Sequence, residues 1–192
     1  MNTVPMILKA AAIEPGDLLH VRSHGKVFKV VPVGKLIRRV LDSWGNHDAV
    51  LDFDDETGEL IIKESHPPRS GETPWYVYDE GMRSGLYECR VYRPMCDANI
   101  RALACRIWEK DVHNLDYDSL AFVRLLIKAQ LMDIWPKAAG LEWSWYCTEG
   151  VNHSYKKAGF DIYNKNNATP GTTERRVGVT LEDITARVLI PA

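Results

Sequence analysis

The stretch HDAVLDFDDETGELIIKE, residues 47–64, decides the fold. The residues from Ala49 to Phe53 are apolar except for Asp52, and a second, largely apolar run lies between Gly58 and Glu64. Short apolar runs bounded by polar turn residues are typical of strands. The polar run at 54–57 between them indicates a loop. We therefore expect an antiparallel hairpin.

A loop at 54–57 pairs Phe53 with Gly58 and, counting back along both strands, His47 with Glu64. Directly opposite residues share a face of the hairpin. This face is the more apolar one, since it also carries Ala49, Leu51, Phe53, Leu60 and Ile62. The sequence thus predicts an imidazole and a carboxylate at the end of an apolar face, and a carboxylate there can orient a histidine base.

Further strands are expected on either side of this hairpin. A Pro15-Gly16 turn within residues 13–22 leads into an apolar run, and residues 75–78 and 86–93 are rich in Tyr, Val and Trp. Pro67-Pro68 should end the second hairpin strand, because proline has no backbone N–H to donate to a neighbouring strand. Together these segments predict an antiparallel sheet.

The second half of the chain is expected to be mainly helical. Asp97 is a candidate N-cap for a helix through Trp108, and Asp118 for a second through Met132. A third helix is predicted from Cys147 to a stop at Gly159, and a short one at 34–41. Residues 164–173, rich in Asn, Thr, Gly and Pro, are predicted to form a loop.

The predicted fold class is α+β, with an antiparallel sheet packed against a helical layer. We expect one domain over residues 1–192, with its core at about 13–159 and a loop and closing segment at 160–192. The 192 residues are 45% hydrophobic and 26% charged, with a net charge of −2, which is typical of globular proteins.

Several classes of protein do not fit the composition. Basic residues occur as short pairs, Arg38-Arg39 and Arg175-Arg176, so no nucleic-acid surface is expected. No stretch approaches the ~20 apolar residues of a membrane span, and residues 1–12 make a poor signal peptide. These features favour a cytoplasmic protein, with phage association left open and the oligomeric state undetermined.

The chemistry is sought among the four cysteines, which are Cys89, Cys96, Cys105 and Cys147. They form no C-x-x-C pair, so neither a zinc site nor any other metal or cofactor is expected. Cys147 is predicted to begin a helix, where free N–H groups favour a thiolate and can stabilise an oxyanion. Cys96 also precedes a helix and is the rival nucleophile.

A base must come from one of six histidines, which are His20, His24, His47, His66, His113 and His153. His153 points to a different side of its helix from Cys147. His47 is favoured because Glu64 is expected beside it. Each feature alone also occurs in proteins without catalysis, since a cysteine at a helix start is more often structural.

Several short motifs occur in the order of a known family: Pro15-Gly-Asp-Leu-Leu19, Asn46-His47, Glu64, Asn114-Leu-Asp-Tyr-Asp118 and Tyr146-Cys-Thr-Glu149. In this order the chain resembles the circularly permuted papain-like cysteine hydrolases, the permuted NlpC-like group related to lecithin–retinol acyltransferase. In that group the sheet precedes the cysteine helix. The resemblance spans roughly Ile13 to Gly159, and Val179 to Asp183 is similar to the family's closing segment.

The resemblance implies that Cys147 is the nucleophile, His47 the base and Glu64 the third, polar member of a triad. It further implies that Asp17 lies near the cleft and that Tyr117 is a substrate-side tyrosine.

The aromatic run before the cysteine has two interpretations. Trp145 and Tyr146 line the substrate cleft, or their rings pack the helix onto the sheet. Two positions depart from the family's pattern. Asp48 follows the histidine where small or aliphatic residues are usual, and Thr148 follows the cysteine where serine is common.

The expected activity is hydrolysis of an amide or peptide bond, such as one in a cell-wall peptide, through a thioester. Hydrolysis or transfer of a lipid acyl group from an ester or thioester is an alternative. A second alternative is a non-catalytic binding protein, or a structural component of a virion, that keeps the fold. The expected partner is a peptide or an acyl-bearing substrate.

Overall fold

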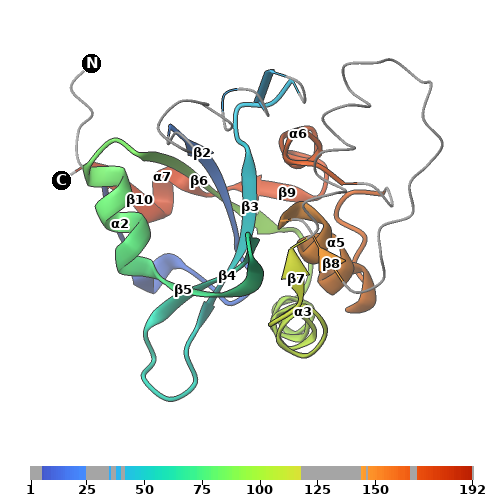
Figure 1. The fold of residues 1–192 in the computed structure, drawn as a ribbon. Helices are drawn as coiled ribbons and strands as arrows, with labels where there is room; N and C mark the ends of the chain where they lie inside the picture. The colour runs from blue at the N-terminus through green and yellow to red at the C-terminus, as the bar shows by residue number, and fades with distance from the viewer. Residues whose placement is uncertain are drawn as a thin grey trace.

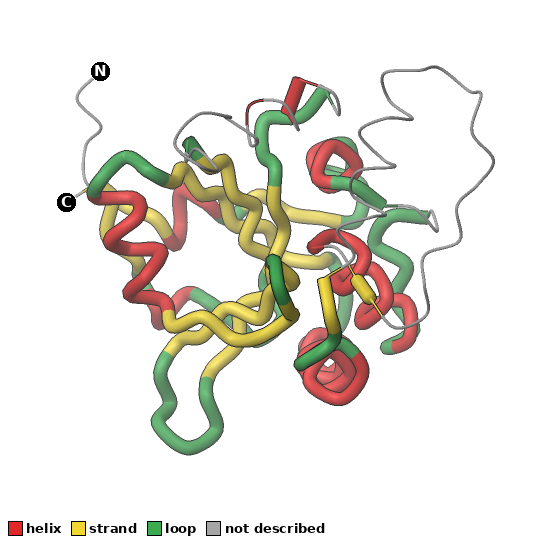
Figure 2. Tube along the Cα trace, in the orientation of Figure 1, coloured by secondary structure: helices red, strands yellow, loops and turns green. Residues whose placement is uncertain are grey.

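The structure, a computed structural model, describes residues 6–24, 35, 38–39, 42–117, 144–145, 147–164 and 168–191. These residues form an α+β fold, which confirms the predicted class. Figures 1 and 2 show a strongly curved sheet with helices on both sides.

Six antiparallel strands make up the centre of the main sheet. In spatial order they are β5 (Arg69–Pro74), β4 (Leu60–His66), β3 (His47–Phe53), β2 (Leu18–Ser23), β6 (Tyr87–Pro94) and β9 (Leu181–Asp183). Beyond β5 lie β7 (Asp116–Tyr117) and then β8 (Ser144–Trp145), which pair in parallel. A separate pair consists of β1 (Met6–Leu8) and β10 (Leu189–Pro191).

Helices cover the two faces of this sheet (Figure 1). On one side lie α2 (Trp75–Arg83) and α7 (Thr185–Val188), and on the other lie α3 (Ala98–Asp111), α5 (Cys147–Lys157) and α6 (Pro170–Glu174). A short 3-10 turn, η1 (Ala10–Ala12), precedes β2. The strands are buried on both faces, which explains why their alternation is incomplete.

Two hydrophobic clusters follow from the alternation of each strand. The face toward α2 and α7 buries Leu19, Val21, Ala49, Leu51, Ile62 and Val91 with Tyr78, Met82 and Val188. The face toward α3 and α5 buries Leu18, Val50 and Tyr92 with Trp108, Val112, Val151 and Tyr155. The predicted apolar face of the hairpin is therefore confirmed as one wall of the first cluster.

The register of the hairpin differs from the prediction by two positions. Phe53 pairs with Leu60, not with Gly58, because the loop is longer than expected. Asp54 holds this loop: its carboxylate accepts from the backbone N–H of Glu56 and Thr57. A shift of two positions leaves every side chain on its predicted face, because the side-chain period of a strand is two.

The prediction of a strand at 75–78 is wrong, since these residues begin α2. The β propensity of Trp, Tyr and Val is overridden by packing, which buries Tyr78 and Met82, one helical turn apart, against the sheet. On the side of β4 away from β3, the paired strand is β5. This strand directly follows the two prolines and was not predicted.

Two helix predictions and one loop prediction can be compared with the structure. Asp97 caps α3 as predicted, accepting from Asn99 N, and α5 begins at Cys147. The predicted loop 164–173 is partly wrong, since α6 begins at Pro170 after a capping box of Thr169 and Thr172. The predicted helix at 118–132 lies outside the described residues, as does most of the one at 34–41.

The C-terminal segment belongs to the core more fully than predicted. Leu181, Ile184 and Val188 are buried, and β9 pairs with β6. No helix among the described residues has the length and hydropathy needed to cross a membrane.

Candidate active site

Cys147 is the first residue of α5, and its side chain is 8% exposed. The N–H groups of a first helical turn have no partners within the helix, and they attract negative charge. The helix lies close to the sheet at Gly150, where an added Cβ would be 3.1 Å from Val112 and 3.3 Å from Ser65 Oγ. A larger residue at 150 would therefore push the cysteine away from β4.

His47 is the first residue of β3 and pairs with Val21 of β2. Its Nε2 donates to Glu64 Oε2 at 2.6 Å, and the side chains of His47 and Glu64 are 17% and 5% exposed. The predicted contact of imidazole and carboxylate is present, although the two residues are diagonal neighbours and not directly opposite.

Glu64 is fixed by two further donors. Thr73 Oγ1 of β5 donates to Oε1 at 2.5 Å, and Tyr78 OH of α2 donates to Oε2 at 2.7 Å. Burial raises the pKa of Glu64, but the bonds from His47, Thr73 and Tyr78 outweigh burial and set the pKa at about 2. Glu64 is therefore an oriented carboxylate at neutral pH.

Cys147 also interacts with the His47 ring. Burial lowers the pKa of His47, but the charge of Cys147 and a hydrogen bond with it, followed by Glu64, outweigh burial and raise the pKa well above its usual value. Because Nε2 binds Glu64, Nδ1 is the ring nitrogen left for the sulfur. The structure thus brings together the three residues that the resemblance places in a triad.

The residues that follow the two reactive positions are also in contact. Thr148 Oγ1 donates to Asp48 Oδ2 at 2.6 Å, and both side chains are fully buried. Thr173 Oγ1 of α6 donates to the same oxygen at 2.9 Å. The other oxygen, Asp48 Oδ1, accepts from His20 Nδ1 at 2.6 Å.

His20 is a buried imidazole between two carboxylates. Its Nε2 is 3.1 Å from Glu174 Oε1, and its side chain has no exposed surface. Burial lowers the pKa of His20, but Asp48 and then Glu174 outweigh burial and raise the pKa to about 9. His20 is therefore a buried cation at neutral pH.

Glu174 also anchors the loop that leads into β3. Its Oε1 accepts from Ser43 Oγ at 2.5 Å, Trp44 N at 2.6 Å and Gly45 N at 3.2 Å. Burial raises the pKa of Glu174, but the bonds from His20, Ser43 and Gly45 outweigh burial and hold the pKa at about 2. The segment just before His47 is thereby fixed to α6.

Asp17 does not join this group. Its carboxylate is fully buried and accepts from Arg93 Nε at 2.8 Å, Arg93 Nη2 at 2.7 Å and Glu14 N at 2.9 Å. These contacts give Asp17 a structural role in holding Arg93, and its expected place near the cleft stays a prediction.

The turn before Asp17 is conformationally demanding. Gly16 has φ +88°, and an added Cβ would be 2.6 Å from Tyr155 OH of α5 and 2.7 Å from Arg101 Cβ of α3. Tyr155 OH also donates to Gly16 O. The turn at Gly16 therefore connects the sheet to α3 and α5.

The aromatic residues predicted at the cleft are only partly described. Tyr117 and Trp145 are partners in the parallel pairing of β7 with β8, which leads the backbone toward Cys147. Their side chains and all of Tyr146 lie outside the described residues, so their expected contacts with a substrate stay predictions.

The other cysteines are less suited to nucleophilic chemistry. Burial raises the pKa of Cys89, Cys105 and, despite Arg101, Cys96. Because the thiolate is the nucleophile, a raised pKa disfavours each of them, including the predicted rival Cys96.

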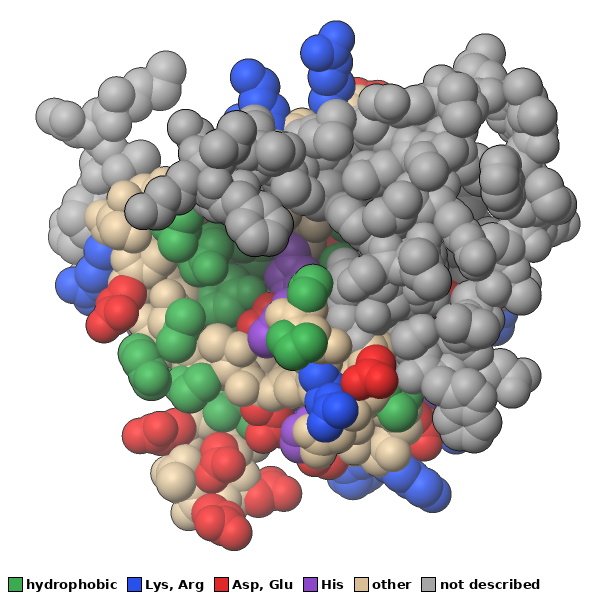
Figure 3. Space-filling view, viewed as in Figure 1, with side chains coloured by type: hydrophobic (Ala, Val, Ile, Leu, Met, Phe, Trp, Pro, Cys, Tyr) green, Lys and Arg blue, Asp and Glu red, His purple; other side chains and the backbone are tan. Residues whose placement is uncertain are grey.

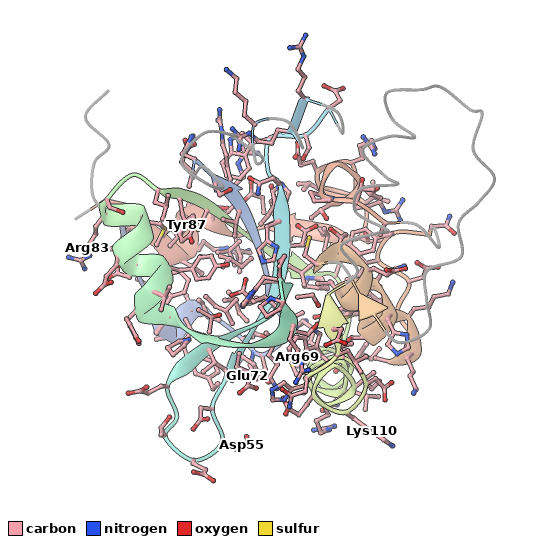
Figure 4. All side chains as sticks on the ribbon, viewed as in Figure 1. Asp55, Arg69, Glu72, Arg83, Tyr87 and Lys110 are labelled. Carbon is pink, nitrogen blue, oxygen red and sulfur yellow. The ribbon has the colours of Figure 1, made fainter. Side chains whose placement is uncertain are left out.

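Within the described residues, one group of side chains has the spacing of metal ligands: Glu72, Glu109 and His113. Lys63 Nζ lies 3.6 Å from Glu72 Oε1 and 3.2 Å from Glu109 Oε2, so a lysine cation already pairs with both carboxylates. Figure 4 shows Glu72 on β5, away from the start of α5. We assign this group to an ion-pair network.

Comparison with known proteins gives a fold but no family. No protein-family description and no curated protein matches the sequence. Among solved structures, the chain is similar to the metalloprotein YiiX of Escherichia coli O157:H7, a DUF1105 protein, with a TM-score of 0.56. The sequences are 16% identical over 93% of this chain and 88% of that one, a likeness that shows a shared fold alone.

Proposed function

We propose that this protein is a thiol hydrolase of the permuted papain-like kind, with Cys147 as nucleophile, His47 as general acid and base, and Glu64 as orienting carboxylate. The observation that carries the proposal is the position of the His47 imidazole, held by Glu64 through Nε2 and interacting with Cys147. Nucleophile, base and a third orienting group are the three parts of a catalytic triad.

The reaction would proceed in two acyl transfers. Cys147 Sγ, as thiolate, bonds to the carbonyl carbon, and the His47 imidazolium gives its proton to the leaving nitrogen or oxygen as that bond breaks. Water then attacks the thioester while neutral His47 takes a proton from it. Collapse of that intermediate releases the carboxylic acid and restores the thiolate–imidazolium pair.

The start of α5 supports both steps. The Cys147 N–H is adjacent to the sulfur, and backbone N–H groups at a helix start stabilise the oxyanion that forms on the attacked carbonyl.

An amide or peptide bond, as in a cell-wall peptide, is our first proposed substrate, on the basis of the family resemblance. A lipid acyl ester or thioester is the second candidate. It is favoured by the hydrophobic side chains that gather in a hollow beside a histidine in Figure 3. Exposed apolar side chains of α2 and the turn after it, Tyr76 and Leu86, add to the apolar surface.

The decisive experiment is alkylation by iodoacetamide at pH 7, with the modified cysteine identified by mass spectrometry. We expect Cys147 to react at least about tenfold faster than Cys89, Cys96 or Cys105, because Cys147 lies beside the His47 base, whereas burial raises the pKa of the other three thiols. His47→Gln should remove this preference. Reaction spread over all four cysteines would leave the non-catalytic binding or virion component as the better proposal.

Turnover is tested with two probe sets, peptide amides and p-nitrophenyl esters of short and long fatty acids. We expect one of the two probe classes to leave an acyl group on Cys147. This acylation should be absent in Cys147→Ala. Activity on both sets that survives Cys147→Ala would contradict the proposed nucleophile.

A further inference from the structure

Each of the two proposed catalytic residues is followed in sequence by a buried residue of one hydrogen-bonded network. Asp48 follows His47, Thr148 follows Cys147, and Thr148 Oγ1 donates to Asp48 Oδ2 at 2.6 Å. A single side-chain hydrogen bond therefore connects the backbone of β3 to the first turn of α5, one residue away from the reacting atoms on each side.

The other oxygen of Asp48 is also held by a hydrogen bond. This oxygen accepts from His20 of β2, and His20 is in turn held by Glu174 of α6. Burying one carboxylate alone is unfavourable, and a paired cation offsets that cost. The His20 imidazolium thus places a cation beside the fully buried carboxylate of Asp48.

We propose that Thr148 and Asp48 are positioning residues, and that the His20 imidazolium between Asp48 and Glu174 fixes the separation of the Cys147 sulfur from the His47 ring. This inference rests on the proposed thiol chemistry. It assigns a use to the two positions where the chain departs from the resembling family's pattern.

The groups that face His20 come from four elements. They are Asp48 of β3, Glu174 of α6, the Trp44 ring at 5.6 Å from the loop before β3, and the Tyr92 ring at 5.7 Å from β6. Arg90 of β6 lies over the Trp44 ring, 4.0 Å from its centroid. Burial lowers the pKa of His20, but the two carboxylates together outweigh burial, so His20 is charged below about pH 9.

Two threonines allow a matched test. Thr148 and Thr173 are both fully or nearly fully buried, and both donate to Asp48 Oδ2, at 2.6 Å and 2.9 Å. Thr173 belongs to α6 and lies outside the path from Cys147 to His47. Each hydroxyl has one further contact, Thr148 Oγ1 with Cys147 Sγ at 3.8 Å and Thr173 Oγ1 with Tyr163 OH at 3.3 Å. Thr148→Val and Thr173→Val therefore remove the same kind of bond to Asp48, but only the first releases the cysteine helix.

The experiment measures two quantities in the full chain: the rate of Cys147 alkylation by iodoacetamide at pH 7, and the pKa of His47 from ring NMR signals. We expect Thr148→Val to lower the alkylation rate about tenfold or more, since small misplacements cost large factors. It should also move the pKa of His47 toward its usual value. Thr148→Ser, which restores the hydroxyl, should return both quantities to near wild type.

Equal effects of Thr148→Val and Thr173→Val on both quantities would overturn the positioning role. If the valine is not tolerated, Thr148→Ala removes the same hydroxyl without adding a methyl group. If the wild-type protein shows no preference for Cys147, the proposed function fails, and the His47 titration still decides whether Thr148 positions the pair.

Discussion

Glu64 accepts hydrogen bonds from both His47 Nε2 and Tyr78 OH on the same oxygen, at 2.6 Å and 2.7 Å. Its other oxygen is held by Thr73. The carboxylate that orients His47 is therefore fixed by β5 and by α2 as well as by its own strand. Four measurements follow from this arrangement and from the network beside it.

The first prediction concerns the contact of Cys147 with His47. Cys147→Ala should lower the pKa of His47, because Cys147 is the largest influence that raises it while burial acts in the opposite direction. The pKa is read from the ring NMR signals as a function of pH. Cys96→Ala, which removes a partly exposed cysteine elsewhere, is the control and should leave the titration unchanged.

The second prediction concerns acid stability. The pKa of Glu64 falls from 4.5 to about 2 on folding, so its contribution is present above pH 4.5 and is lost as pH falls toward 2. The contribution amounts to about 3 kcal/mol at neutral pH. Glu64→Gln should flatten the decline in the free energy of urea unfolding between pH 6 and 3, whereas Glu56→Gln in the exposed hairpin loop should not.

The third prediction concerns His20 at alkaline pH. Because folding raises the pKa of His20 to about 9, its stabilisation is complete below about 6.5 and is lost as pH rises through 9. His20→Gln should lower the free energy of unfolding at pH 7 by about 3–5 kcal/mol, since the buried Asp48 and the partly buried Glu174 lose their cation.

The control for that substitution is His24→Gln, which changes an exposed histidine paired with Glu88. Its effect should stay below about 1 kcal/mol. A similar loss in both variants would show that His20 is not a buried cation.

The fourth prediction separates Asp17 from the site. Asp17→Asn should reduce the free energy of unfolding by roughly 1–3 kcal/mol, because it weakens a buried ionic pair with Arg93. The alkylation rate of Cys147 should change less than about twofold, as for other changes away from a site. A large loss of alkylation in a well-folded Asp17→Asn protein would support the expectation that Asp17 lies at the cleft.

The sequence could predict the contact of His47 with Glu64 even though the predicted register was wrong. Alternation defines which face each residue occupies, and the error of two positions, caused by the loop that Asp54 holds, preserves the face. The side chain of Glu64 is long enough to reach His47, its diagonal neighbour on the adjacent strand. An error of one position would have separated the pair.

The errors elsewhere have a common physical cause, which is that tertiary contacts outweigh local composition. The segment from Trp75 has strand-forming side chains but becomes helical, where Tyr78 can reach Glu64. The segment around Thr169 has a loop-like composition, yet its capping box and Pro170 are themselves helix-start signals.

The network of His20, Asp48 and Glu174 could not be found from the sequence. The partners of His20 are 28 and 154 positions away, and buried polar residues interrupt the alternation that marks strands. The one available signal was the unusual Asp48 after the histidine, which the structure connects to Thr148.

The close approach of Gly45 to His20 has a consequence for the evolution of this sequence. A Cβ on Gly45 would lie 2.4 Å from His20 Nε2, so the ring occupies the space that any other residue at 45 would need. The two positions are thus coupled in size as well as in charge. Among descendants of this chain, a side chain can be gained at 45 only where the ring at 20 is given up, and the two sites should covary through evolution.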